Sequence, residues 1–150
     1  MPAASEGRPA LPRTWRPLGV RLAVIVFGGL LVLVCAFAWF GFDASVRDRF
    51  TLFQRATLVL LAALFGAVGH ALARSRVVAE ADRLVVVNGY RRRELAWAEV
   101  LAVHLVPGAP WAVLDLADGS TASVLAIQGS DGDRARRAVR EIRSLLEPMP

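Results

Sequence analysis

The chain has 150 residues, a formal net charge of +5 and one cysteine. Its basic excess lies at the beginning, because residues 1–21 hold four arginines against one glutamate, while residues 74–150 hold eleven arginines against ten acidic residues. A nucleic-acid-binding domain would carry such an excess in its folded part, where it neutralises phosphates. We therefore expect no nucleic-acid partner. The single cysteine, Cys35, excludes an intrachain disulfide and a multi-cysteine zinc site.

Residues 1–20 are rich in proline and arginine and have no periodic apolar face. This composition predicts a flexible basic tail. A signal peptide is the alternative interpretation, but the apolar region of a signal peptide usually runs about 7 to 15 residues, shorter than the run that follows here. We therefore favour a retained membrane anchor. Trp15 and Trp39 near the ends of that run fit an aromatic belt.

Two apolar runs, 22–42 and 56–73, predict a two-helix transmembrane hairpin over residues 21–74. The first run holds 21 residues without a charge, and at about 1.5 Å per residue it matches the roughly 30 Å hydrocarbon core of a bilayer. The arginines before the hairpin outweigh those of the loop 43–55. By the positive-inside rule we expect an integral, multi-pass protein of the cell membrane with both termini cytoplasmic.

The second run carries small residues spaced by four, three and four positions. They are Ala62, Gly66, Gly69 and Ala73. This spacing places them on one helix face, where another helix can approach closely. We expect the first helix to pack there, and a homodimer seam is the alternative.

After residue 74 the pattern changes to short apolar segments separated by turns. The segments 84–87 and 90–95 flank Asn88-Gly89, and 111–117 and 120–127 flank Asp118-Gly119, which predicts two hairpins with two-residue type I′ turns. With 99–106, and 77–80 as a leading strand, five or six antiparallel strands are expected. Ser130 and Asp133 have the spacing of a capping box before an amphipathic helix that ends near Pro148.

The residues carry a family resemblance beyond the order of elements. The segments are DRLVVVNGYRRR (82–93), WAEV (97–100), PWAVLDLADG (110–119), IQ (127–128) and DGDRA (131–135). They closely resemble the bacterial membrane-bound PH-like family of the low-molecular-weight antigen type, in which a two-helix hairpin commonly precedes the domain. The resemblance implies a small α+β, mainly β, domain over 75–147, with a bent antiparallel sheet and a C-terminal helix. It also implies that one strand is missing or very short.

No reaction chemistry is apparent in the sequence. His70 and His104 have no neighbouring Asp, Glu or Cys at ligand spacing, and no nucleophile elbow or phosphate loop occurs. We expect no catalytic, cofactor-binding or metal site, and hence no enzyme. Asp115, in the middle of a strand, is expected to pair with an Arg or His of an adjacent strand.

The leading hypothesis is a non-catalytic interaction module on the cytoplasmic face that binds a protein partner or scaffolds at the membrane. The alternative is recognition of an anionic lipid headgroup through Arg83, Arg91 and Arg93, where each arginine near the surface contributes on the order of 1 kcal/mol. A third interpretation of the basic patch 91–93 is protection of an edge strand by charge. Because the hairpin already supplies membrane attachment, the protein partner is favoured.

Overall fold

The computed structural model describes residues 9–147. The chain forms two units: one contains the segment up to Gly19 together with everything from Arg74 onward, and the other is Val20–Ala73.

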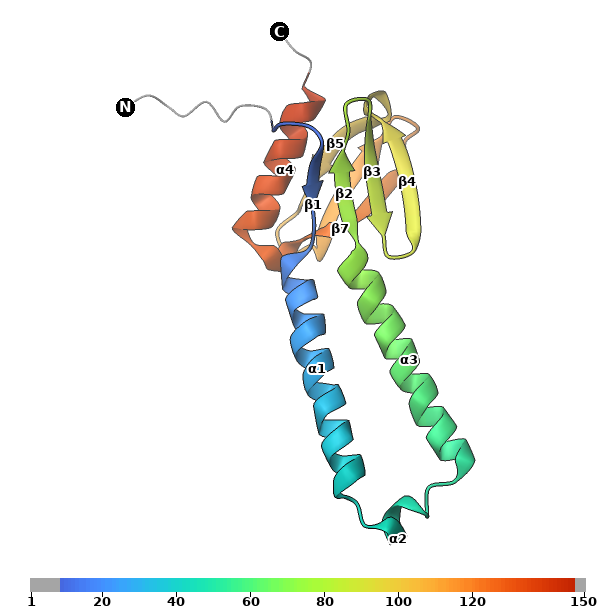
Figure 1. The fold of residues 1–150 in the computed structure, drawn as a ribbon. Helices are drawn as coiled ribbons and strands as arrows, with labels where there is room; N and C mark the ends of the chain where they lie inside the picture. The colour runs from blue at the N-terminus through green and yellow to red at the C-terminus, as the bar shows by residue number, and fades with distance from the viewer. Residues whose placement is uncertain (1–8, 148–150) are drawn as a thin grey trace, which may run out of the picture. The chain divides into compact units, whose positions relative to one another are not determined.

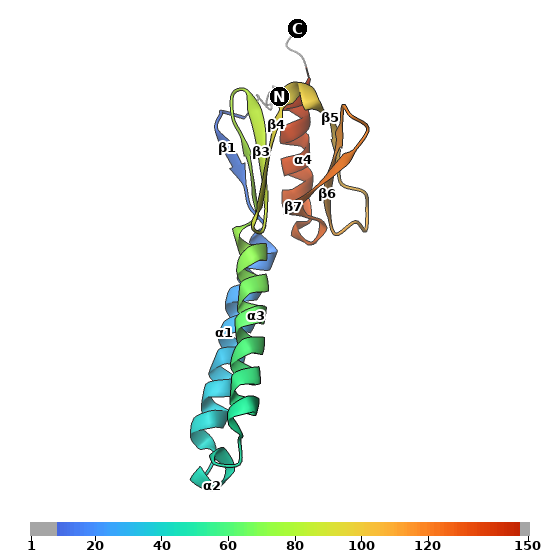
Figure 2. The same ribbon diagram turned by 90° about the vertical axis from the view of Figure 1, so that its right-hand side faces the viewer.

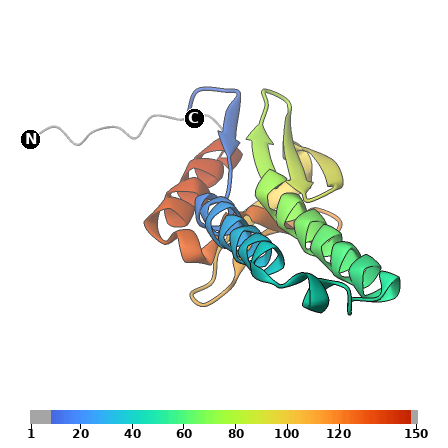
Figure 3. The same ribbon diagram turned by 60° about the horizontal axis from the view of Figure 1, so that its bottom comes forward.

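The hairpin consists of α1 (Leu18–Gly41), the short α2 (Ala44–Arg47) and α3 (Leu52–Arg74) (Figures 1 and 3). Both long helices are long and apolar enough to cross a membrane, and both begin four residues earlier than predicted. For α3 the reason is a capping box that the prediction missed, because Thr51 and Gln54 exchange backbone-to-side-chain hydrogen bonds of 2.9 and 3.2 Å. Neither long helix contains a buried residue.

Over residues 9–147 the domain contains seven strands in two antiparallel sheets and one C-terminal helix (Figures 1 and 2). The first sheet has the order β1 (Arg13–Trp15), β2 (Arg76–Ala79), β3 (Arg83–Asn88) and β4 (Arg91–Ala96). The second has the order β5 (Val100–His104), β6 (Trp111–Leu116) and β7 (Thr121–Gln128). Short 3₁₀ turns, η1 (Trp97–Glu99) and η2 (Gly129–Asp131), precede β5 and the helix α4 (Asp133–Leu146).

The strand β1 corrects the predicted tail over residues 1–20. Arg13 to Trp15 pair antiparallel with Ala79 to Val77 of β2, and Trp15 is only 8% exposed in the domain core rather than in an aromatic belt. Three residues are too few to show a strand period, and the flanking prolines favour an irregular tail by composition. Proline is tolerated here because β1 is an edge strand. Residues 1–8 of the predicted tail lie outside the described residues.

The domain is therefore interrupted by the hairpin. Its first strand comes before α1 and its second strand comes after α3, so the hairpin occupies the connection between β1 and β2. This position explains why the sequence after residue 74 lacks one strand of a PH-like fold. The predicted domain boundaries of 75–147 leave out the segment that contains β1.

Both predicted hairpins are present, but their turns differ from type I′. In the first, Asn88 pairs with Arg91, so the loop residues are Gly89, with φ 61°, and Tyr90, which is the glycine position of a type II′ turn. In the second, Leu116 accepts a hydrogen bond from the Gly119 amide, and Gly119 has φ 80°. This is a three-residue loop with a glycine bulge.

The core lies between the two sheets and α4. Leu84, Leu95, Leu114 and Ile142 are its largest fully buried side chains. The helix α4 confirms the predicted apolar stripe, since Ala135, Ala138, Val139 and Ile142 are buried. The predicted capping box is absent, because the residue before α4 is Gly132 and no side chain caps the helix.

Candidate functional site

Two hollows in the described part of the domain are lined by arginines. The first, which we call the β4–β7 groove, has a volume of about 530 Å³ and lies between β4 and the beginning of β7. Its lining comprises Val86 and Asn88 of β3, Arg91, Arg92 and Arg93 of β4, and Thr121, Ala122 and Ser123 of β7. The structure thus places all of the predicted basic patch 91–93 in one hollow.

The strand register separates the three arginines by face. Arg93 pairs across the sheet with Val86, which belongs to the core, whereas Arg92 pairs with Val87. Because side chains alternate along a strand, Arg91 and Arg93 share the face that looks toward the second sheet. Arg92 lies on the other face, where its guanidinium is 2.7 Å from a Glu94 carboxylate oxygen.

Two strand edges border this groove, because β4 ends the order of the first sheet and β7 ends that of the second. Asn88, the last residue of β3, joins the first sheet to β7 at one point. Its side-chain amide donates to the Ser123 carbonyl at 2.6 Å, and its side-chain oxygen accepts from the Leu125 amide at 3.0 Å. Asn88 therefore takes the place of a strand partner on the outer edge of β7.

Arg83, the third predicted contact residue, does not line the groove. Its guanidinium forms ion pairs with Asp82, Glu80 and Glu94 at 2.8, 3.5 and 2.7 Å. Hydrogen bonds from Arg83 lower the pKa of the Asp82 carboxyl and of the Glu94 carboxyl, and hydrogen bonding to Asp82 raises the pKa of Arg83 above its ordinary value. The positive charge of Arg83 is therefore balanced by neighbouring carboxylates. These ion pairs lie at one end of the β3–β4 pair.

Arg91 and Arg93 differ from Arg83 in their surroundings. Within residues 9–147, no carboxylate oxygen lies within 4 Å of either guanidinium. The charge of Arg93 has a small effect on Asp118. The pKa of the Asp118 carboxyl is lowered mainly because the Ser120 hydroxyl donates a hydrogen bond to it, and the Arg93 charge lowers it to a smaller extent. The groove therefore presents two cations with hydroxyl groups and backbone edges beside them.

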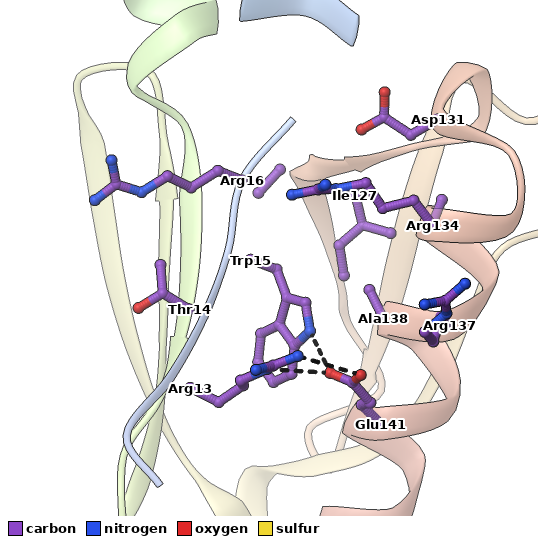
Figure 4. A pocket seen from close by; sticks show the side chains of 12 residues that line it. Arg13, Thr14, Trp15, Arg16, Ile127, Asp131, Arg134, Arg137, Ala138 and Glu141 are labelled. Atoms are coloured by element: carbon purple, nitrogen blue, oxygen red, sulfur yellow. Dashed lines mark hydrogen bonds and ion pairs between the residues drawn. The ribbon is translucent and has the colours of Figure 1, made fainter. Parts of the chain in front are cut away.

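The second hollow, the β1–α4 pocket, has a volume of about 490 Å³. It lies between β1, β7 and α4, and Figure 4 shows the side chains that line it. Glu141 occupies its inner wall. Its carboxylate accepts a 2.8 Å hydrogen bond from the Trp15 indole and lies 3.3 Å from the Arg13 guanidinium. The sequence alone does not predict this pocket, because one wall precedes the hairpin and the other lies near the end of the chain.

Asp131, at another wall of the pocket, binds the first residues of α1. Its two carboxylate oxygens accept hydrogen bonds from the amides of Leu18 and Gly19, at 3.0 and 2.9 Å. A Cβ atom on Gly19 would lie 2.8 Å from the Asp131 oxygen, so a larger residue at this position requires the carboxylate to move. Asp131 thus caps α1 across more than one hundred residues of sequence.

The predicted helix-packing face is occupied in part. A Cβ atom on Gly69 would lie 3.2 Å from a methyl group of Val24 in α1, whereas one on Gly66 would meet nothing within 4 Å. Ala62 is exposed and Ala73 is half-buried. Close approach between α1 and α3 is therefore seen at Gly69, and a homodimer seam remains a prediction.

Two further predictions concern single residues. A carboxylate oxygen of Asp115 lies 3.5 Å from Nδ1 of His104 on the neighbouring strand, which confirms the predicted cross-strand partner. Trp97 packs against the core and its indole donates a hydrogen bond to the Glu80 carbonyl, while Trp111 is 37% exposed. In residues 9–147, no group of three or more His, Cys, Asp or Glu side chains is arranged to hold a metal ion.

Comparison with known proteins identifies the domain. The family model described as "Bacterial PH domain" matches residues 74–145. Uncharacterized proteins of Mycobacterium tuberculosis, strains H37Rv and CDC 1551, and of Mycobacterium bovis are each 33% identical to the chain over 135 residues, which cover 88% of this chain and 84% of the relative. No solved structure matches significantly. On the family match and the seven-stranded fold with its C-terminal helix, the chain belongs to the bacterial PH domain family.

Proposed function

We propose that this protein is a membrane-anchored, non-catalytic interaction module whose PH-like domain lies on the cytoplasmic face. Its partner is an acidic, extended protein segment that binds in the β4–β7 groove. The observation that carries the proposal is the pair Arg91 and Arg93, which lies without a carboxylate partner in residues 9–147 beside two strand edges.

Membrane attachment is supported by the exposed apolar surface of the hairpin. Large side chains such as Phe27, Phe40 and Phe65 are about 70% exposed or more. A soluble protein rarely leaves a patch of this size uncovered, and lipid is the solvent that such helices require. The cytoplasmic orientation rests on the arginine excess before α1, in keeping with the positive-inside rule.

The shape and charge of the partner follow from the groove. A strand edge offers backbone N–H and C=O groups that an extended segment can pair with, as in β-strand addition. Arginine side chains next to such an edge favour carboxylates, which they bind with charge-assisted hydrogen bonds. Thr121 and Ser123 supply further polar groups.

The alternative partner, an anionic lipid headgroup held by Arg83, Arg91 and Arg93, receives less support. Arg83 is bound by three carboxylates and does not line the groove. Only two of the three arginines are therefore available to a headgroup in this place. Attachment by the hairpin also removes the need for lipid affinity in recruitment.

The proposal is tested with the full chain in nanodiscs of neutral lipid. A fluorescent octapeptide of alternating Glu and Val is titrated, with the matching Gln and Val peptide as the uncharged probe. We expect the acidic peptide to bind more tightly, and R91Q/R93Q to weaken it by about tenfold or more, since each charge-assisted hydrogen bond contributes about 1.5 to 3 kcal/mol.

The control variant is R136Q/R140Q, which removes the same charge from the exposed face of α4. It should leave peptide binding within about twofold, because a distant exposed charge is screened. Equal binding of the two peptides would contradict the proposal. Binding to phosphatidylserine vesicles that depends on Arg91 and Arg93, with no binding of the acidic peptide, would favour the lipid alternative.

A further inference from the structure

We infer that the β1–α4 pocket is a second binding site, specific for a phosphate group carried by a small organic body, with Arg134 and Arg137 as its principal contacts. This site is separate from the β4–β7 groove and does not depend on the proposed function. Its lining contains four arginines, Arg13, Arg16, Arg134 and Arg137, against two carboxylates, Asp131 and Glu141.

Both carboxylates of the pocket already have partners. Glu141 accepts from the Trp15 indole at 2.8 Å and from Arg13 at 3.3 and 3.4 Å. Asp131 accepts from two backbone amides at the beginning of α1. Glu141 thus accepts three hydrogen bonds and Asp131 two, and the four arginines of the lining leave a formal excess of two positive charges over these two carboxylates.

Arg134 and Arg137 are the cations that remain. Among the residues that the structure describes, no carboxylate oxygen lies within 4 Å of either guanidinium, whereas Arg136, between them, pairs with Asp133 at 3.5 Å. The two side chains are three positions apart and so share a face of the helix. Arg134 extends from α4 toward β1, while Arg16 points to the far side of β1 (Figure 4).

The place of these arginines on α4 is unfavourable without an anion. Arg134 lies in the first turn of the helix and Arg137 at the start of the second, and the positive end of the helix dipole disfavours a cation in the first turn. A bound anion reverses this effect, because it interacts favourably with both the dipole and the guanidinium groups.

Phosphate is the anion that best matches this chemistry. The planar guanidinium group donates two parallel hydrogen bonds to phosphate oxygens, and two arginines supply enough donors for a doubly charged group. A pocket of about 490 Å³ is larger than phosphate alone requires and falls within the range typical of small organic ligands. The buried side chains of Trp15, Ile127 and Ala138 form the apolar floor of the pocket, against which the organic body would lie.

Two sources share this chemistry, a phospholipid headgroup and a free phosphorylated metabolite. Two probes distinguish them: short-chain phosphatidic acid and glycerol 3-phosphate. Binding of each probe to the full chain in neutral detergent is measured by native mass spectrometry, with phosphatidylcholine as the zwitterionic reference. Binding of phosphatidic acid alone identifies a lipid source, and binding of glycerol 3-phosphate shows that the phosphate and its small body suffice.

The variant R134Q/R137Q should weaken binding of the phosphate probes by about tenfold or more, because it removes charge-assisted hydrogen bonds. The matched control R136Q/R140Q removes two arginines from the same helix outside the pocket lining and should change binding by less than about twofold. Near-ultraviolet circular dichroism checks that both variants keep the folded environment of Trp15.

Two results would overturn the inference. One is that neither phosphate probe binds the unmodified chain in preference to phosphatidylcholine. The other is that the two double variants weaken binding equally, which would show general attraction to a basic helix instead of a site.

Discussion

The hairpin and the domain are both rich in apolar residues but use them in opposite ways. In Val20–Ala73 neither long helix buries a side chain, whereas the domain buries Leu84, Leu114 and Ile142 completely. The domain satisfies its apolar side chains by packing strands and a helix around one core. In the hairpin the corresponding side chains stay exposed on two helices that are long and apolar enough to cross a membrane, where lipid would cover them.

The strand β1 makes this comparison more informative, since it belongs to the domain although it precedes the anchor. Its pairing with β2 joins the residues before α1 to those after α3. The domain is therefore complete only when the two ends of the hairpin are close together. Domain stability and hairpin geometry should influence each other through this strand.

The largest expected effect comes from Trp15. Trp15→Ala removes a buried indole and its hydrogen bond to Glu141, which should lower the free energy of unfolding of the domain by about 3 to 5 kcal/mol. Chemical denaturation of the full chain in neutral detergent measures this free energy of unfolding. Trp39→Ala in α1 is the matched control and should leave the domain unchanged. Equal effects of the two variants would contradict the assignment of β1 to the domain.

A smaller effect is expected at Asn88, which joins the sheets inside the domain. Asn88→Ala leaves the Ser123 carbonyl and the Leu125 amide without their partner, at a cost of about 1 to 3 kcal/mol. Asn88→Asp keeps the acceptor for Leu125 but places a carboxylate against a carbonyl, so it should also destabilise. Unchanged denaturation midpoints for both variants would show that the bridge contributes nothing.

Next in size is the cap on the first residues of α1. Gly19→Ala brings a Cβ atom to 2.8 Å from Asp131, and loss of such a cap typically costs about 1 kcal/mol. Gly28→Ala, where a Cβ atom meets nothing within 4 Å, is the control. Thermal melting should show that Gly19→Ala and Asp131→Ala are not additive, because both remove the same cap. Full additivity of the two changes in stability would show that Gly19 and Asp131 do not contribute to the same cap.

The smallest effect is expected at the Arg83 cluster, whose groups are exposed. Because Arg83 lowers the pKa of the Asp82 and Glu94 carboxyls, their contribution to stability is present above the ordinary pKa near 4 and disappears as the pH falls below it. The difference in Tm between the unmodified chain and R83Q should therefore shrink between about pH 6 and pH 3. A constant difference would contradict this account.

Much of the fold was predictable from local sequence patterns. The two apolar runs, the six strands after residue 74 and the apolar stripe of α4 each have enough residues to show their period. The type of the first turn was not predictable in detail, because Asn88 is not a loop residue. It pairs with Arg91 and its side chain bonds to the distant strand β7, which leaves Gly89 and Tyr90 in the loop.

The candidate sites were predictable only in part. The run Arg91 to Arg93 is visible as a local charge cluster, and the structure places it in one groove. The separation of Arg83 from that groove depends on Glu94 and Glu80, whose positions follow from strand register. The β1–α4 pocket joins segments more than one hundred residues apart, and local periodicity carries no information about such a pairing.

The most direct test of the account is a disulfide between β1 and β2. Thr14 and Val78 are register partners, so T14C/V78C in a C35A background should form a crosslink on mild oxidation of isolated membranes. The pair V113C/S123C, from register partners in β6 and β7, controls for the folding of the domain. We predict crosslinking of both pairs. Crosslinking of the control pair without that of Thr14 and Val78 would contradict the claim that the strand before the hairpin completes the domain.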